Sequence, residues 1–394
     1  LFRSKSTLLA KLSRLLDSRF FVVFFSISDL IEMSDVNHIN ILFTIAVQMM
    51  AEAKERQVKI KPETEKQLYQ WFATKTRTEI EQVNAEVSGG FDLLKVIAGK
   101  LKVDATVRNE IKQEFLRNIP ELMGRINEIA LTIEAATNKE ILVIIDDLDK
   151  LDLSVVEEIY KNNVKTLFQP DLRVIFTIPI SAFRDLEIKA ILITETSDEI
   201  VIMSVSKLFT KEQRERFNSP PKSGLAWALQ GVFKLLGMGE DRQANSEPQQ
   251  EQVAVLKEAI AKRIKRELIE EETVEKIILA SGGVFRELIR ISNECCRVCL
   301  QSIRRNPEDT NIKINDEVLR EAIKEIRIDF DMGIGTKDYQ ILKKVSEDFS
   351  PRDANEDRFL KLLHGLYVLE YRNAELWYDI HPIVRELLQQ KGVL

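Results

Sequence analysis

The sequence has little of what marks the specialised structural classes. Only three cysteines, Cys295, Cys296 and Cys299, occur in 394 residues, and they crowd one stretch, which excludes a disulfide framework. The 14 glycines and 10 prolines are too few for a collagenous or low-complexity chain. The longest apolar run has six residues, 20–25, whereas a membrane-spanning helix needs roughly 20. Because no signal-like segment opens the chain, we expect a globular cytoplasmic protein without membrane helices.

Excess charge of one sign and histidine are also scarce. The 57 basic and 63 acidic residues leave a net charge of −6, which argues against a protein that coats nucleic acid by bulk electrostatics. The three histidines, His38, His364 and His381, lie in no recognisable nucleophilic triad. Cys296 and Cys299 have metal-like spacing but lack a second pair of ligands, so packing on one helix face explains the cysteines better.

The first half of the chain alternates buried strands with amphipathic helices. Uniformly apolar runs at residues 20–25, 141–145, 172–178 and 200–205 predict strands that are buried on both faces. This alternation predicts an α/β fold with a parallel sheet covered by helices. Helical periodicity is found at residues 8–16, at 38–59, at 111–129 with Pro120 as a kink, and at 153–167, and a polar segment near 88–104 interrupts it.

The second half is mainly helical. A polar segment at residues 237–252 predicts a flexible loop, and periodicity at 253–268, 273–280 and 284–300 predicts a small helical domain. The end of the chain then predicts two helices, a hairpin and a last helix, which is typical of a winged helix. These elements fall at residues 338–347, 356–363, 367–371 and 376–379, and from His381 or Pro382 onward.

The predicted winged helix has no clear DNA-binding charge. Residues 337–394 contain nine Lys or Arg against ten Asp or Glu, so the basic footprint of a DNA reader is missing. Arg358, Lys361 and His364 share one helical face, which suits a groove-binding helix and equally a solvated surface. DNA contact and a packing or signal-relay role both stay open.

Lys5, Ser6 and Thr7 open the first predicted helix, after Ser4. A phosphate-binding loop requires backbone N–H groups at a helix N-terminus, a lysine that reaches the terminal phosphates, and a hydroxyl directly after it for Mg²⁺. Lys5 and Ser6 have that order. The signature also requires glycine at the position of Ser4, and another glycine that would fall before Leu1. An ordinary helix N-cap is the alternative explanation.

The segment ILVIIDDLDK at 141–150 has the second chemical signal. Two acids, Asp146 and Asp147, end an apolar strand, which directs carboxylates to the sheet edge where α/β folds bind ligands. The first acid would hold Mg²⁺ through its water shell and the second would orient an attacking water. The alternative is that Asp147 or Asp149 caps the following helix. Burying carboxylates without a cation is costly, so the pair favours a functional site.

Together these segments resemble the AAA+/STAND class of P-loop ATPases. The resemblance extends in order over nearly the whole chain and is closest to the initiator-like and signalling branches, while DDLDK is similar to KAP and NACHT-like groups. Ser4 departs from the loop glycine, and the membrane helices of KAP proteins are missing. The matching segments are KSTLL at 5–9, ILVIIDDLDKLD at 141–152, VIFTIP at 174–179, SGGVFREL at 281–288 and the predicted winged helix.

The resemblance implies roles for further residues. Thr177 and Arg286 would sense the γ-phosphate from the sheet edge and from a helical lid, with an ordinary strand-end threonine and a surface arginine as the alternatives. His381 would contact the β-phosphate, unless it is only the first residue of a helix under the wing. Arg184 would act as an arginine finger on a neighbouring subunit. Ser4, Lys5, Ser6 and Thr7 would bind the phosphates.

We therefore predict three parts and two alternative functions. The parts are an N-terminally truncated P-loop core at 1–205 with a helical insertion at 55–138, a helical lid at 206–305 and a winged-helix domain at 306–394. The first function is an ATP-binding and ATP-hydrolysing switch or motor that uses Mg²⁺, acts on a protein partner and forms homo-oligomers. The alternative is a non-hydrolysing regulator or scaffold that binds protein or DNA through the winged helix.

Overall fold

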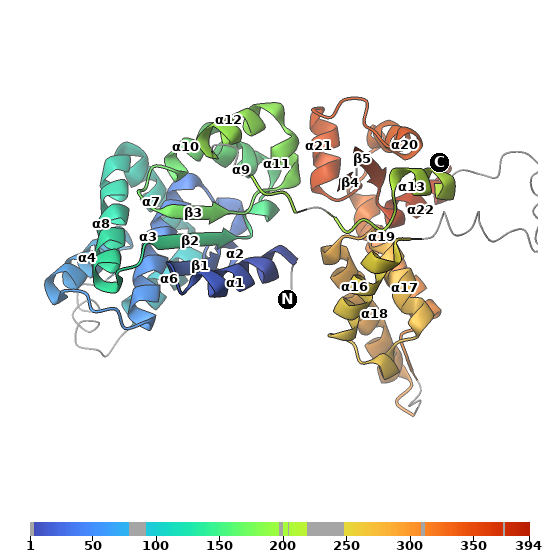
Figure 1. Cartoon of the computed structure of the whole chain (residues 1–394), viewed down its shortest axis with the longest axis horizontal. Coiled ribbons are helices and arrows are strands. Elements are labelled where there is room, and N and C mark those ends of the chain that lie inside the picture. The colour runs from blue at the N-terminus through green and yellow to red at the C-terminus, as the bar shows by residue number, and fades with distance from the viewer. Residues whose placement is uncertain are drawn as a thin grey trace, which may run out of the picture. The chain divides into compact units, whose positions relative to one another are not determined.

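The chain forms an N-terminal unit, Ser4–Val201, and a C-terminal unit, Ile202–Leu394. The structure is a computed structural model and describes residues 4–78, 92–196, 200–203, 205–218, 248–308, 312–372 and 375–394. Figure 1 labels the elements of both units, which are described here one at a time. The fold is α/β and mostly helical, as the alternation of strands and helices predicts.

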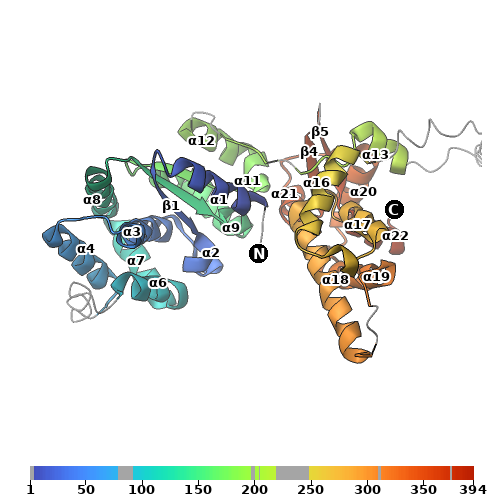
Figure 2. The same cartoon turned by 60° about the horizontal axis from the view of Figure 1, so that its bottom comes forward.

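A three-stranded parallel sheet lies at the centre of the N-terminal unit (Figures 1 and 2). Its strands β1 (Phe21–Ser26), β2 (Ile141–Asp146) and β3 (Arg173–Phe176) lie in that order. Every residue of β2 is buried, because this strand has neighbours on both sides and apolar side chains on both faces. Three of the four predicted strands are therefore confirmed.

The fourth predicted strand, at 200–205, is wrong in the part of it that the structure describes. Residues 200–203 and 205 have no strand partner, and the Val201 side chain is 96% exposed. Val205 packs instead against the cluster of Phe349, Leu369 and Trp377 in the C-terminal unit. An apolar extended segment becomes a strand only beside a neighbour with free backbone groups, and this segment passes from one unit to the other.

Helix α1 (Ser4–Leu16) covers one face of the sheet. Its Leu9 and Leu16 pack against Val22, Leu142 and Ile144, and Figure 2 shows the helix lying along the sheet. The opposite face contacts a much larger core that extends into the helices of the predicted insertion. Both faces of the sheet are therefore covered, as predicted.

Helix α3 (His38–Glu55) is the centre of that larger core. Thirteen of its 18 residues are buried, because its sequence is apolar nearly all round and helices pack on it from several sides. Four helices of the predicted insertion follow it in the described residues: α4 (Pro62–Lys75), α6 (Leu93–Val103), α7 (Ala105–Arg117) and α8 (Ile119–Thr137).

Two predictions in this region are wrong. The polar segment near 88–104 contains α6, whose N-terminus is capped by the Asp92 carboxylate accepting from the Lys95 amide at 3.3 Å. The periodicity across 111–129 belongs to two helices that meet at Asn118, rather than to one helix with a kink. Pro120 lies in the first turn of α8, where its missing N–H has no helical partner to lose.

The chain after β2 is irregular. The predicted helix at 153–167 is split into α9 (Leu153–Val156), a π-helical turn η3 (Glu157–Asn162) and α10 (Val164–Leu167). Sequence periodicity does not distinguish a π turn from an α turn, so this break was not predicted.

The remaining elements of the N-terminal unit are α2 (Ile27–Leu30), η1 (Met33–Asp35), η2 (Leu148–Lys150), α11 (Ile180–Arg184) and α12 (Leu186–Thr196).

In the C-terminal unit, α16, α17 and α18 correspond to the three predicted helices, although the first predicted helix, at 253–268, ends at Ala261 and a separate turn η4 follows it, and α13 was not predicted. Cys295 and Cys299 are buried on one face of α18, as the packing explanation predicted, and all three cysteines are free. Helix α19 was not predicted, and most of the predicted loop at 237–252 lies outside the described residues. The helices are α13 (Lys211–Asn218), α16 (Gln250–Ala261), η4 (Arg266–Leu268), α17 (Glu271–Ala280), α18 (Phe285–Arg305) and α19 (Asp316–Met332).

The last elements of the chain follow the predicted order of two helices, an antiparallel hairpin and a helix. Gly282 and Gly283 lie in the turn before α18. They let this turn pack closely against the hairpin and against the segment before α13. A Cβ on Gly283 would lie 2.2 Å from the Ser206 carbonyl oxygen, so both glycines serve close packing. The elements are α20 (Asp338–Asp348), α21 (Asp357–His364), β4 (Val368–Arg372), β5 (Leu376–Ile380) and α22 (Pro382–Gln390).

A buried cluster of charges joins α13, β5 and α22. The Asp379 carboxylate accepts from Arg214 Nε at 2.6 Å and forms an ion pair with Arg385 through its other oxygen. Burial lowers the pKa of Arg385 from its usual range, although the Asp379 charge opposes this. Two arginines thus depend on one buried carboxylate.

Among the described residues, no helix is both long enough and apolar enough to cross a membrane.

Candidate functional site

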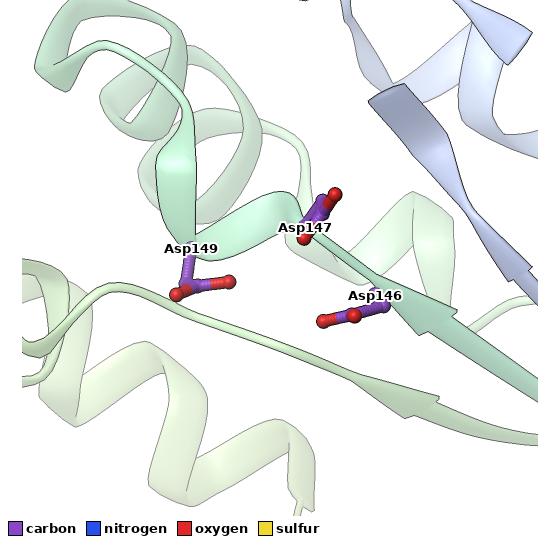
Figure 3. A group of neighbouring side chains, drawn as sticks. All are labelled: Asp146, Asp147 and Asp149. Atoms are coloured by element: carbon purple, nitrogen blue, oxygen red, sulfur yellow. The ribbon is translucent and has the colours of Figure 1, made fainter. Parts of the chain in front are cut away.

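Three carboxylates gather where β2 ends, at the carboxyl edge of the sheet. Asp146 is the last residue of β2, Asp147 follows it, and Asp149 lies in η2 (Figure 3). One ligand atom from each lies within 4.8 Å of the others. Asp146 and Asp147 are buried, so the structure brings together a cluster that is costly to desolvate without cations. Below, these three residues are called the acidic cluster.

Asp147 is held in an unusual position. Its φ of 73° lies in the left-handed region, which turns its carboxylate away from the path of the strand. Its Oδ2 accepts hydrogen bonds from Ser26 Oγ and Ser28 Oγ, both at 2.8 Å, and its Oδ1 pairs with Lys150. Asp147 makes no side-chain capping bond to η2, so helix capping does not explain it.

The N-terminus of α1 reaches the same edge. Lys5 lies in its first turn and forms an ion pair with Asp149. The two sequence signals, 144 positions apart, are therefore brought together by the fold. In the described residues no hydrogen bond links Ser6 or Thr7 to the acidic cluster, and the Ser4 side chain lies outside the description.

Thr177 follows β3 and fastens the turn that contains the acidic cluster. Its hydroxyl oxygen accepts from the Leu148 amide at 3.0 Å, and its carbonyl accepts from the Tyr160 hydroxyl at 3.0 Å. Burial, together with the nearby Asp149 charge, raises the pKa of Tyr160 so that it stays a donor. Thr177 thus lies at the predicted edge, where its hydroxyl oxygen accepts one hydrogen bond and its own O–H can still donate.

Sequence reasoning missed four residues around the cluster: Ser26, Ser28, Lys150 and Tyr160. A signal existed for the serines, because Ser26 directly follows a buried strand and lies opposite Asp146 in the parallel register. Lys150 is three residues after Asp147, within reach across one turn. Tyr160 reaches Thr177 from the π turn, and no pattern in the sequence predicts that turn.

The acidic cluster suits a hard cation. Its donors are carboxylate oxygens, the ligands that Mg²⁺ and Ca²⁺ prefer, and it has no sulfur or imidazole. Lys5 and Lys150 neutralise two of the three negative charges through Asp149 and Asp147. Two of the three carboxylates of the acidic cluster therefore have a lysine partner.

Three further residues with roles implied by the resemblance lie on other elements: Arg286 and His381 belong to the C-terminal unit, and Arg184 belongs to the N-terminal unit. Arg286 lies on α18 of the C-terminal unit with its side chain 47% exposed, and its nearest carboxylate is Glu287 at 3.9 Å. His381 is fully buried inside the C-terminal unit, where its Nδ1 accepts from the Ile383 amide and its ring lies 4.9 Å from Phe330. Arg184 ends α11 in the N-terminal unit and its guanidinium lies over Phe183.

The burial of His381 predicts how the stability of the C-terminal unit depends on pH. Burial, with a smaller effect of the Arg290 charge, lowers the pKa of His381 to about 3. The unfolded chain therefore binds more protons between pH 6.5 and 3, and His381 should cost about 1.4 kcal/mol of stability per pH unit as the pH falls through this window. Urea unfolding at several pH values measures the slope.

His381→Asn is the matched variant for this measurement. Asparagine still caps the N-terminus of α22 but does not titrate, so its stability should depend less on pH below 6.5. The difference between the two slopes belongs to His381, because other groups titrate in both proteins. Equal slopes would contradict the prediction.

The predicted DNA-facing residues are partly engaged within the protein. Arg358 donates to Asp338 at 2.7 Å, which ties α21 to α20. Lys361 and His364 lie in the last turn of α21 and Lys361 has no carboxylate partner among the ion pairs of the described residues. Of the three predicted residues, Arg358 is therefore shown to be paired with a carboxylate within the protein.

Comparisons of the chain with protein-family models, curated proteins and solved structures found no significant match. The functional conclusions therefore depend on the residues and their geometry.

Proposed function

We propose that the N-terminal unit binds ATP with Mg²⁺ and hydrolyses it, as a nucleotide-driven switch or motor of the AAA+/STAND type. The observation that carries the proposal is the ion pair between Lys5 and Asp149, which unites the lysine of a helix N-terminus with the acidic cluster at the carboxyl edge of a parallel sheet. Ligands of open α/β sheets bind at this edge. A helix N-terminus with a lysine attracts phosphate, and the carboxylates attract the accompanying cation.

The charges of the site suggest how it would receive a triphosphate. Lys5 would leave Asp149 and neutralise the terminal phosphates, while Asp146 and Ser6 would hold Mg²⁺, which shields the phosphate charge when bound. Asp147 would orient the attacking water and accept its proton, and Thr177 would contact the γ-phosphate. This exchange of partners keeps each buried carboxylate near a cation throughout.

The C-terminal unit would then respond to the nucleotide. In this proposal residues 206–305 form a lid in which Arg286 approaches the γ-phosphate, and residues 306–394 form a winged helix that passes the change to a protein partner. Movement of a lid that closes only on triphosphate is a common way to couple hydrolysis to work. Assembly into homo-oligomers and DNA binding by the winged helix belong to the same proposal.

A nucleotide-independent scaffold is the second candidate function. Two observations favour it: Ser4 stands where a phosphate loop has glycine, and both oxygens of Asp147 are already engaged by Ser26, Ser28 and Lys150. In this case the acidic cluster and its lysines are a buried ion network that holds the sheet edge together.

Titration with Mg-ATP distinguishes the two functions. We expect saturable binding by calorimetry to the wild-type protein, and a loss of about tenfold or more in affinity for Lys5→Met, because a charge-assisted phosphate contact is removed. Lys11→Met, on the exposed side of the same helix, is the control and should bind as the wild type does. Failure of the wild type to bind would leave only the scaffold.

A further inference from the structure

A lysine of the helical insertion contacts the loop that holds Asp147. Lys102, in the last turn of α6, donates to the Ser28 carbonyl at 2.6 Å and to the Ile31 carbonyl at 3.4 Å. These carbonyls end the short helix α2, whose carboxyl end needs donors from elsewhere. An ammonium group at a helix C-terminus is favourable both as a donor and as a charge.

The same loop fixes the acidic cluster. Ser28 donates its hydroxyl to Asp147 at 2.8 Å while its carbonyl accepts from Lys102, so one residue joins the insertion to the cluster. Among the described residues, Lys102 has no carboxylate partner that would compete for its ammonium group. Its role in the structure is therefore to hold α2.

The backbone at Lys102 is held in turn by Arg108. The buried Arg108 of α7 donates through Nη1 to the carbonyls of Leu101 and Lys102, at 2.8 and 3.0 Å, and through Nε to Asp35 at 3.0 Å. Polar contacts thus continue from the insertion, through α6 and α2, to Asp147. In each of these contacts the acceptor is a backbone carbonyl or a short side chain. The positions of α6, α2 and Asp147 are therefore closely coupled.

We propose that Lys102 is a positioning residue for the proposed nucleotide site: by holding α2 it keeps Ser28, and through Ser28 the Asp147 carboxylate, in place. This inference rests on the proposed function for its catalytic consequence, but not for its structural part. It gives the insertion at 55–138 a purpose, because the insertion then supplies one support of the catalytic edge. Displacement of α6 would displace Asp147.

The test compares Lys102→Met with Lys100→Met. Lys100 is the matched control because it lies on the same helix and also donates to carbonyls, those of Thr76 and Arg77 behind α4, away from the acidic cluster. Methionine keeps the length and apolar stem of either lysine. Any general loss from weakening α6 should therefore appear in both variants.

The first measurement is amide hydrogen exchange by mass spectrometry, without nucleotide. We expect peptides covering residues 24–32 to exchange faster in Lys102→Met, and to exchange as in the wild type in Lys100→Met. Unchanged exchange of these peptides in Lys102→Met overturns the inference, whether or not the protein binds ATP.

The second measurement is the rate of Mg-ATP hydrolysis. A misplaced Asp147 should lower kcat by roughly ten- to a hundredfold with little change in KM, since the phosphates are held by other residues. Ser28→Ala should lower kcat similarly. The double variant Lys102→Met/Ser28→Ala should be no slower than Ser28→Ala alone, because Lys102 acts on Asp147 through Ser28. A wild-type kcat in Lys102→Met, or fully additive effects in the double variant, overturns the catalytic role. Absence of hydrolysis in the wild type instead counts against the proposed function and the catalytic part, while the exchange result still decides the structural part.

Discussion

Asp379→Asn is expected to lower the stability of the C-terminal unit by about 3–5 kcal/mol, the usual cost of breaking a buried ion pair from one side. Asp379 is the shared partner of Arg214 and Arg385, and its side chain is only 3% exposed. Asparagine keeps the shape but removes the charge, so two buried guanidinium groups would repel each other without a compensating carboxylate. Urea unfolding followed by circular dichroism measures the loss.

Two further variants show whether the loss comes from the buried charge. Asp331→Asn breaks the partly exposed pair with Lys391 and should cost no more than about 1 kcal/mol. Arg214→Met leaves Asp379 paired with Arg385, so it should cost less than Asp379→Asn. Equal losses for Asp331→Asn and Asp379→Asn would contradict the interpretation of this cluster.

Asp147→Asn should abolish most ATP hydrolysis while sparing nucleotide binding. If Asp147 orients and deprotonates the attacking water, its loss should lower kcat by about a hundred- to ten-thousandfold, the range for a removed general base. Binding should persist because Lys5 and Asp146 are unchanged. Single-turnover hydrolysis and a binding titration on the same preparation separate the two effects.

The matched control is Asp152→Asn, an exposed aspartate five residues further along that makes no capping bond. It should hydrolyse ATP at the wild-type rate. Equal turnover in Asp147→Asn and the wild type would exclude Asp147 from the chemistry and would favour a purely structural role for its bonds to Ser26 and Ser28.

Much of the fold follows from local pattern. Strands β1 and β2 could be predicted because their residues are apolar without interruption, and the last five elements because turn residues separate clear periodic segments. Asp146, Asp147 and Lys5 could be chosen as candidates since acids at a strand end and a lysine at a helix start have few ordinary uses together. In the structure Lys5 pairs with Asp149, two residues after Asp147.

The remaining features depend on tertiary context. The segment at 200–205 has the composition of a strand, but its described residues, 200–203 and 205, have no strand partner, and composition cannot reveal that. Ser26, Ser28 and Lys102 acquire their importance only from which carbonyl or carboxylate lies opposite. Helix α19 was not predicted, although its Asn315 cap and its apolar spacing are present in the sequence.

The buried helix α3 has a consequence for the boundaries along which this protein can be divided. Phe43 shares one continuous hydrophobic core with Val23 and Ile145 of the sheet and with Ile97 and Ile126 of the insertion. Excising residues 55–138 would therefore uncover the interior of the sheet domain instead of removing an appendage. The sheet and the insertion therefore form a single compact unit with one shared core.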